Sequence, residues 1–324
     1  MQSTRRVMGH RDSVILKLEG GLGNQLFQFA AGYYLASKNN TSLYIDQYSI
    51  PLTTFYGEKS FGFEQFEFNP INGFRDYKVL KHIPNSFIVN LSKRYIIVKR
   101  LILKFRMLTS NILRIPVYAE KNENPELSDF YKINGATKLH GNFQSWQLVE
   151  NAALYGFPKI LKLKNTPDWI LELNKTKEFQ ESLVLHLRVD KIARSNITFQ
   201  QPSENYYLNA IKIAQSMKSF NKLYVLSDDI PFAQTVFQNK LPEDIEFLEM
   251  PIHASPAERL YCMSLFGGII CANSTFCGWA AWSIYNSGGL VFVPLPYGDG
   301  KVPGSRDFPN SWIKLDKVSG VQLD

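Results

Sequence analysis

The sequence of 324 residues is poor in cysteine. Its three cysteines are Cys262, Cys271 and Cys277, and their separations match no zinc-binding motif. An odd number also cannot form the disulfide framework that is typical of small secreted proteins. We therefore expect three buried free thiols in a reducing compartment.

Signals for the membrane and for secretion are missing as well. No apolar run reaches the roughly 18 residues that a membrane-spanning helix requires. The first residues are polar and basic, without the apolar core of a secretory signal peptide. These absences predict a cytoplasmic protein.

Several nucleotide-binding motifs are also absent. The sequence contains no GxxxxGK[ST] loop, no GxGxxG turn and no Asp-x-Asp pair of the kind that holds a divalent metal beneath a nucleotide sugar. P-loop chemistry is therefore disfavoured, and a departing diphosphate would have to be stabilised by cationic side chains of the protein. We expect no metal and no other cofactor.

The composition indicates a folded protein with anionic partners. Hydrophobic residues make up 45% of the chain and aromatic residues 14%, and the length suffices for two domains of ordinary size. The net charge of +7 favours nucleotides, phosphorylated lipids, membrane surfaces or nucleic acid, without choosing among them.

The segment GGLGNQLFQF, residues 20–29, is the most informative part of the first half. It follows an apolar run at 14–18 that predicts a buried strand, and it opens a helical pattern over 27–36. Backbone N–H groups at such a turn can hold a phosphate, and Gly23, Asn24 and Gln25 would stand at the first helical turn. A purely structural turn is the alternative.

The rest of the first half continues an α/β pattern. A strand at 42–46 completes a βαβ unit and ends on Asp46, which is a candidate base or a simple cap. Another strand leads into His140, which is either a core histidine or a site residue beside a Gly-Asn-Phe-Gln turn. The basic amphipathic segment 90–114 predicts an ordinary surface helix or one that lies on an anionic membrane.

The second half predicts a doubly wound parallel sheet. Apolar runs at 182–187, 222–226, 245–248, 268–272 and 290–293 alternate with helical stretches. Ser203 marks the start of one such stretch, and a capping box from Ser255 to Glu258 marks the start of another. We predict an N-terminal domain at 1–155, a linker at 156–180 and a C-terminal nucleotide-binding domain at 181–324.

Polar residues follow the predicted strands of this second half. His186 and Arg188 stand at the end of the first strand, and a guanidinium there could neutralise a diphosphate. An ion pair between Arg188 and Asp190 is the structural alternative. Asp228 closes the next strand, and the segment 273–279 opens a helix predicted over 280–285. The hydroxyls and amides of that segment form a second anion site or an ordinary N-cap.

Five blocks together resemble the bacterial α-1,2-fucosyltransferase family: 20–29, 141–145, 186–190, 227–229 and 273–282. Their order and spacing match over about residues 13–295. The resemblance implies a GT-B arrangement of two facing Rossmann-like domains with parallel sheets and a donor cleft between them. It also implies an inverting, metal-independent transfer of L-fucose from GDP-fucose to the 2-hydroxyl of a terminal galactose.

One block departs from the family pattern. The family usually carries His-x-Arg-Arg-x-Asp, whereas His186 and Arg188 are followed directly by Val189 and Asp190. The second arginine is missing and Asp190 stands one position closer. Altered donor handling, another donor sugar or weak activity would each be consistent with this change.

The resemblance also implies roles for individual residues. Arg188 would bind the β-phosphate, His186 would contact the nucleotide or orient Arg188, and Asp228 would meet the ribose or guanine. The remaining donor-binding candidates are Gly23, Asn24, Gln25, Asp190, Ser274, Thr275 and Phe276. Three candidates for the general base stay open: Asp46, His140 and Glu19.

The expected partners are GDP-fucose and a galactose-terminated oligosaccharide or lipid-linked glycan. A lipid-linked acceptor would bring the cytoplasmic protein to the inner face of the cell membrane. The alternatives are a catalytically inactive glycan- or nucleotide-binding protein, a transferase for another nucleotide sugar and, from the net charge alone, a nucleic-acid-binding protein.

Overall fold

The computed structural model describes residues 13–46, 62–69, 78–80, 116–120, 127–175, 178–189, 201–237, 245–297 and 308–323. The predicted basic segment 90–114, Asp190 and the side chain of Asp46 lie outside the described residues.

The chain divides into two compact units. Unit 1 comprises Met1–Phe61, Phe68–Gln144 and Leu148–Phe157. Unit 2 comprises Gly62–Glu67, Ser145–Gln147 and Pro158–Asp324.

Unit 1 contains a five-stranded sheet in the order β3-β2-β1-β5-β4, in which neighbouring strands pair in parallel. The strands are β1 (Ser13–Lys17), β2 (Ser42–Asp46), β3 (Lys78–Leu80), β4 (Val117–Ala119) and β5 (Thr137–His140). The register aligns Leu16 with Ile45 on one side and with Leu139 on the other. The predicted βαβ unit is confirmed.

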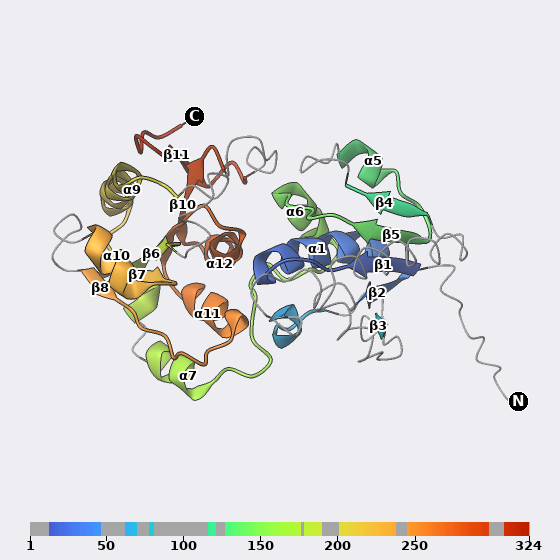
Figure 1. Ribbon diagram of the computed structural model, residues 1–324, viewed down its shortest axis with the longest axis horizontal. Coiled ribbons are helices and arrows are strands. Elements are labelled where there is room, and N and C mark those ends of the chain that lie inside the picture. Colours follow the sequence, from blue (N-terminus) through green and yellow to red (C-terminus); the bar gives the residue numbers. More distant parts are fainter. Residues whose placement is uncertain are drawn as a thin grey trace, which may run out of the picture. The chain divides into compact units, whose positions relative to one another are not determined.

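Helix α1 (Leu22–Lys38) connects β1 to β2 and packs on this sheet (Figure 1). It begins five residues earlier than the apolar period predicted, because Gly20 takes a φ of +73° and turns the chain out of β1 directly into the helix. Aromatic rings extend the core behind it: Phe157 lies 5.5 Å from Tyr33 and 6.1 Å from Phe29 between ring centroids. The other helices of this region are α5 (Leu127–Tyr131) and α6 (Trp146–Leu154).

Unit 2 contains a six-stranded parallel sheet in the order β11-β10-β9-β6-β7-β8. The strands are β6 (Ser182–Leu187), β7 (Lys222–Ser227), β8 (Ile245–Phe247), β9 (Gly268–Ile270), β10 (Leu290–Leu295) and β11 (Ile313–Asp316). Counted from β6, this is the 3-2-1-4-5-6 order of Rossmann folds, and the strand order reverses between β6 and β9. The prediction of two α/β domains with parallel sheets is confirmed.

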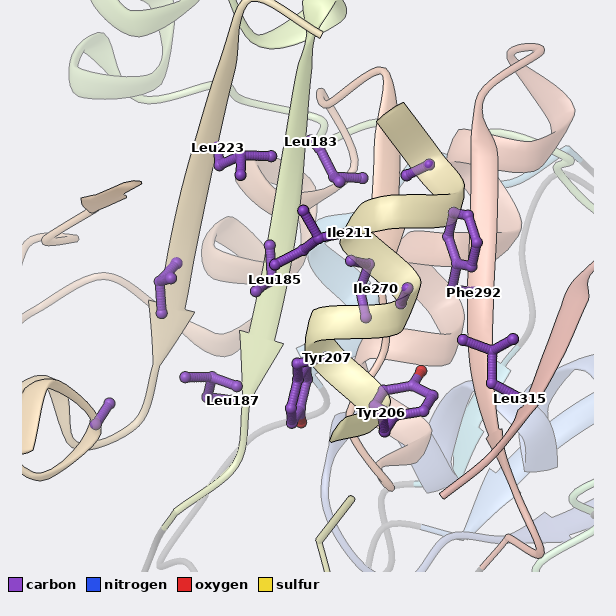
Figure 2. Close-up of a cluster of buried hydrophobic side chains, with 14 residues drawn as sticks. Leu183, Leu185, Leu187, Tyr206, Tyr207, Ile211, Leu223, Ile270, Phe292 and Leu315 are labelled. Atoms are coloured by element: carbon purple, nitrogen blue, oxygen red, sulfur yellow. The ribbon is translucent and has the colours of Figure 1, made fainter. Parts of the chain in front are cut away.

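One face of this sheet is covered by α9 (Glu204–Met217), which begins at the N-cap Ser203 as its start signal predicted. Figure 2 shows leucine, isoleucine and aromatic side chains filling the space between α9 and the strands. Leu185, Ile211 and Phe292 are all at most 2% exposed. Each such side chain contributes roughly 1.5–3 kcal/mol through removal from water.

The remaining helices of unit 2 include elements that the sequence did not reveal. They are η3 (Gly62–Gln65), α7 (Asp168–Lys175), η4 (Glu178–Glu181), α10 (Ile230–Phe237), α11 (Pro256–Met263) and α12 (Thr275–Asn286). The segment predicted as a linker, 156–180, contains α7 and most of η4. Helix α11 starts with the predicted capping box, in which Ser255 and Glu258 bond each other's backbone.

Within the ranges described above, no helix combines the length and the apolar composition needed to cross a bilayer.

Candidate functional site

The carboxyl ends of β6 and β9 define the candidate donor site of unit 2. His186 is the last residue but one of β6, and Arg188 follows the strand directly. The chain leaves β9 through Cys271, Ala272 and Asn273 and enters α12. Ligands of open α/β sheets bind at the edge where the strand order reverses, and the structure brings these predicted residues to that edge.

Two tyrosines of α9 fix the two strand ends. The Tyr207 hydroxyl donates to the His186 carbonyl at 3.3 Å, and the Tyr206 hydroxyl donates to the Cys271 carbonyl at 2.9 Å. Burial raises the pKa of both phenols well above its ordinary value. The two hydroxyls therefore stay protonated and hold the β6 and β9 ends in place.

His186 is buried, with 8% of its surface exposed. Its ring centroid is 6.3 Å from that of Phe276. The Cys277 thiol lies close by: burial alone would raise its pKa, but the Cys271 thiol, His186 and the Ala272 backbone outweigh burial and lower it to about 5. A thiolate in the first turn of α12 is also favoured by the helix dipole.

Arg188 and Asp228 are more accessible. Arg188 is partly exposed. Burial raises the pKa of the Tyr297 phenol well above its ordinary value, and the charge of Arg188 opposes part of this rise. The Asp228 side chain is exposed, and its Oδ1 accepts a hydrogen bond of 2.8 Å from the Val189 backbone. Asp228 therefore ties the end of β7 to the residue that follows Arg188.

The turn before α12 shows the capping arrangement. Ser274 is the N-cap, and its hydroxyl oxygen accepts a hydrogen bond of 3.3 Å from the Phe276 backbone. Asn273 and Ser274 are buried, whereas Thr275 and Phe276 are partly exposed. Phosphate binding at the same turn stays a prediction, since an N-cap and an anion can occupy one helix terminus.

The glycine turn of unit 1 is internally bonded. The Gln25 side chain is fully buried, and its Nε2 donates to the Gly20 carbonyl at 3.0 Å. The Asn24 Oδ1 accepts a hydrogen bond of 3.1 Å from the Gln144 side chain. The amides of Asn24 and Gln25 thus hold the turn and the loop after β5, while Gly23 lies buried in the first helical turn. Contact of these residues with a donor stays a prediction.

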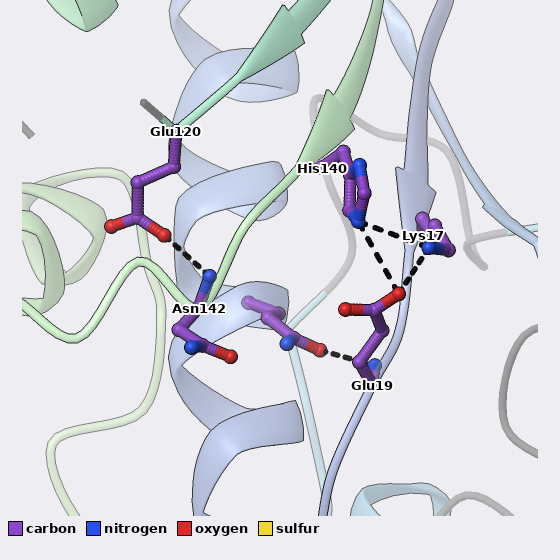
Figure 3. Close-up of polar contacts among 6 residues, drawn as sticks. Lys17, Glu19, Glu120, His140 and Asn142 are labelled. Atoms are coloured by element: carbon purple, nitrogen blue, oxygen red, sulfur yellow. Dashed lines mark hydrogen bonds and ion pairs between the residues drawn. The ribbon is translucent and has the colours of Figure 1, made fainter. Parts of the chain in front are cut away.

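A charged cluster lies at the carboxyl ends of β1 and β5 (Figure 3). His140 Nε2 is 3.3 Å from Glu19 Oε1 and 3.0 Å from Lys17 Nζ, and Lys17 also pairs with Glu19 Oε1. Burial raises the pKa of the Glu19 carboxyl, but hydrogen bonds from His140 and Lys17 and their charges outweigh it and lower the pKa to about 2. Glu19 is therefore ionised across the physiological range.

The loop after β5 is shaped by a carboxylate that the sequence did not single out. Glu120 Oε2 accepts hydrogen bonds from the backbone of Asn142 at 2.5 Å and of Phe143 at 3.1 Å. Phe143 has a φ of +50°, which is uncommon for a residue with a side chain. A Cβ at Gly141 would lie 2.5 Å from the Glu120 side chain, so only glycine fits at this position.

The predicted site residues fall into two groups. Unit 2 holds Arg188, His186, Asp228, Ser274, Thr275 and Phe276, and unit 1 holds Gly23, Asn24, Gln25, Glu19, His140 and Asp46. The backbone register aligns Asp46 with Lys17, so all three candidate bases come from one edge of the first sheet.

Residues that the sequence did not single out complete both sites. They are Lys17, Glu120, Tyr206, Tyr207 and Tyr297. Lys17 could have been found from the sequence, because it is a charged residue within an apolar run. Tyr206 and Tyr207 could not, because they match the pattern of helical core residues. In the part of the chain that the structure describes, no group of three or more His, Cys, Asp or Glu residues is placed to hold a metal ion.

Comparison with protein families finds no matching family model. Two proteins of Escherichia coli are similar over nearly the whole chain. An α-1,2-colitosyltransferase is 27% identical over 320 residues, covering 94% of this chain and 99% of that protein. The O-antigen biosynthesis glycosyltransferase WbnK is 26% identical over 321 residues, covering 92% of this chain and 99% of that protein.

Among solved structures, the chain is similar to the NodZ α-1,6-fucosyltransferase soaked with GDP-fucose. The likeness covers 85% of this chain and 93% of that chain, with a TM-score of 0.47 and 15% identity. The two sequence comparisons, which extend over the full length of both relatives, support a glycosyltransferase activity for the chain.

Proposed function

We propose that the protein transfers L-fucose from GDP-fucose to the 2-hydroxyl of a terminal galactose in a glycan, with inversion and without a metal ion. The observation that carries the proposal is the convergence of His186, Arg188, Asp228 and the start of α12 at one edge of the second sheet. The α-1,2 linkage is supported by the similarity to the α-1,2-colitosyltransferase of Escherichia coli.

In this proposal the donor diphosphate is bound by two kinds of positive group. Arg188 supplies a guanidinium, which can contact two phosphate oxygens at once. The first turn of α12 supplies backbone N–H groups and the positive end of a helix dipole. Both stabilise the negative charge that develops as the bond between the anomeric carbon and the phosphate oxygen breaks.

A second candidate donor is the GDP-activated form of colitose, a deoxy relative of fucose. It is favoured by the 27% identity with an α-1,2-colitosyltransferase. The missing second arginine after Arg188 also distinguishes this chain from the fucosyltransferase pattern. The reaction would be the same, with a donor that lacks one ring hydroxyl.

The test is an assay of nucleoside-diphosphate release with both GDP sugars and with UDP and dTDP sugars, against methyl β-galactoside, lactose and a galactose-terminated lipid-linked acceptor, in the presence of EDTA. We expect release only with a GDP-activated deoxy sugar and a galactose-terminated acceptor. GDP should also raise the melting temperature without metal. GDP binding without any transfer would favour a nucleotide-binding protein instead, and release with only UDP or dTDP sugars would refute the donor proposal.

A further inference from the structure

The charged cluster of unit 1 lies where its sheet reverses the strand order, the edge at which open α/β sheets bind their ligands. Lys17 ends β1, Glu19 follows two residues later, and His140 ends β5. The side chains of Lys17, Glu19 and His140 are 14%, 27% and 43% exposed, respectively. The imidazole and the carboxylate are therefore the members that a bound molecule can reach, and the ammonium lies behind them.

The contacts of the cluster determine where its hydrogen atoms are. The Lys17 ammonium can only donate, and it lies 3.0 Å from His140 Nε2 and pairs with Glu19 Oε1. Nε2 must therefore accept, because a protonated ring would place two cationic donors 3.0 Å apart. The imidazole is thus neutral with its hydrogen on Nδ1. The separation of 3.3 Å between Nε2 and Oε1 results from the ammonium that both atoms contact.

In this arrangement neither side chain is suited to take a proton. The lone pair of His140 Nε2 is occupied by the ammonium, and Nδ1 already carries a hydrogen. Despite burial, contacts with its charged neighbours keep the pKa of Glu19 at about 2, whereas an effective base has a pKa near the working pH. The cluster is better suited to bind a hydroxyl group than to deprotonate one.

Two polar atoms of the cluster are open to a ligand. Among the described residues, His140 Nδ1 and Glu19 Oε2 have no hydrogen-bond partner. Neither atom is buried, in contrast to Gln25 Oε1 and Gln28 Nε2 of the neighbouring helix α1. Nδ1–H can donate to one sugar hydroxyl, and the carboxylate oxygen can accept from another. The charges of Lys17 and Glu19 cancel, which favours a ligand without net charge.

The surrounding structure holds these two atoms in place. The His140 carbonyl accepts a hydrogen bond of 2.9 Å from the Glu120 backbone, and β5 lies between β1 and β4. The Glu19 backbone N–H donates at 2.9 Å to the side chain of Gln28, which is fully buried. A ligand would therefore meet groups that are already oriented, and this lowers the entropic cost of binding.

We propose that Glu19 and His140 bind an uncharged sugar, with Nδ1–H donating to one hydroxyl of the sugar and Glu19 Oε2 accepting from another. Lys17 is a positioning residue that orients both side chains from behind. The identity of the sugar rests on the proposed function, which makes it the terminal galactose of the acceptor. All groups that the contact requires belong to unit 1, and no bond is made or broken in it.

The first test uses no nucleotide sugar. The five histidines can be labelled with ¹⁵N, and the His140 signal can be assigned by its loss in His140→Phe. We expect the Nδ1–H tautomer at neutral pH, and methyl β-galactoside should move the His140 signal until the site is saturated. The signal of His253, an exposed histidine of unit 2, should stay in place. An Nε2–H tautomer, or a His140 signal that the galactoside leaves unmoved, would overturn the inference.

The second test measures the dissociation constant of methyl β-galactoside by saturation-transfer NMR of the ligand. Glu19→Gln removes the charge of the acceptor, and His140→Phe removes the donor while keeping a ring. We expect each change to weaken binding about 10-fold, because each removes or weakens one of the two direct contacts. His253→Phe is the matched control and should bind as the wild type does. Wild-type affinity in either Glu19→Gln or His140→Phe would overturn the inference.

If the galactoside binds at the cluster but no nucleotide sugar serves as a donor, the proposed function fails and the binding site is confirmed. If sugar is transferred while both variants keep the wild-type KM for the acceptor, the binding site is overturned and the proposed function is retained.

Discussion

The two sheet edges share a topology and differ in their chemistry. Each sheet is parallel and reverses its strand order beside its first strand, at β1/β5 in unit 1 and at β6/β9 in unit 2. At the first edge, a carboxylate, an ammonium and an imidazole neutralise one another in partial contact with solvent. At the second, a histidine and two thiols are buried, and an arginine follows the strand that carries the histidine.

The difference indicates which part of a transfer reaction each edge suits. A cluster whose charges neutralise one another suits a polar ligand without net charge. An arginine and a helix N-terminus each attract an anion. Topology determines where a ligand binds, and the side chains at the strand ends determine what charge the bound ligand can carry.

The largest expected effect separates the cores of the two units. All five tryptophans belong to unit 2, so tryptophan fluorescence reports on its unfolding alone. Leu16 in unit 1 and Leu185 in unit 2 are both fully buried. Leu185→Ala should therefore lower the free energy of unfolding measured by fluorescence by about 2–5 kcal/mol. Leu16→Ala should shift the circular-dichroism transition of unit 1 and leave the fluorescence transition in place. Equal shifts of both signals would show that the units unfold as one.

The next effect concerns the cationic edge. Arg188→Ala should lower turnover about 100- to 1,000-fold, the usual result of losing one preorganised group that stabilises a developing anion. Arg188→Lys should retain part of the rate, because an ammonium provides charge without bidentate geometry. Lys175→Ala, at an exposed ion pair of unit 2, controls for net charge. An Arg188→Ala variant with normal turnover would remove this residue from the mechanism.

A smaller effect concerns how the free energy of unfolding depends on Glu19 in acid. The Glu19 carboxyl has a pKa of about 2 in the folded protein, against an ordinary value of 4.5. Its contribution to the free energy of unfolding is therefore present above pH 4.5 and is lost as the pH falls toward 2. With screening by solvent, we expect Glu19→Gln to lower the free energy of unfolding by about 1–2 kcal/mol at neutral pH. In acid the variant and the wild type should converge. Urea unfolding of both proteins across this pH range measures the difference, with Glu172→Gln, at an exposed ion pair, as control.

The smallest effect is spectroscopic and belongs to unit 2. The lowered pKa of Cys277 predicts a thiolate absorbance in the far ultraviolet that disappears on acidification. Cys277→Ser should abolish this step. Cys262→Ser should keep it, because burial raises the pKa of the Cys262 thiol to about 12. A flat absorbance through mildly acidic pH would show that the buried thiol is neutral.

Much of the architecture was predictable from local patterns. Local patterns located eight of the described strands to within about two residues, and Ser203 and Ser255 marked helix starts correctly. Helices α1 and α12 begin five residues before their predicted starts, since glycine and a capping serine open them before the apolar period becomes visible. The edge strands β3, β4 and β11 are three or four residues long and carry too few apolar positions to be recognised.

The sequence by itself determined that the chain forms parallel α/β sheets and that polar residues follow the strands, because both depend on periodicity along a short segment. Only the tertiary structure brought Lys17 and His140 within 3.0 Å of each other across 123 residues. It likewise placed the Tyr206 and Tyr207 hydroxyls on the carbonyls of two different strands. Such contacts depend on strand order and register, which arise from the packing of distant segments and leave no periodic signal in the chain.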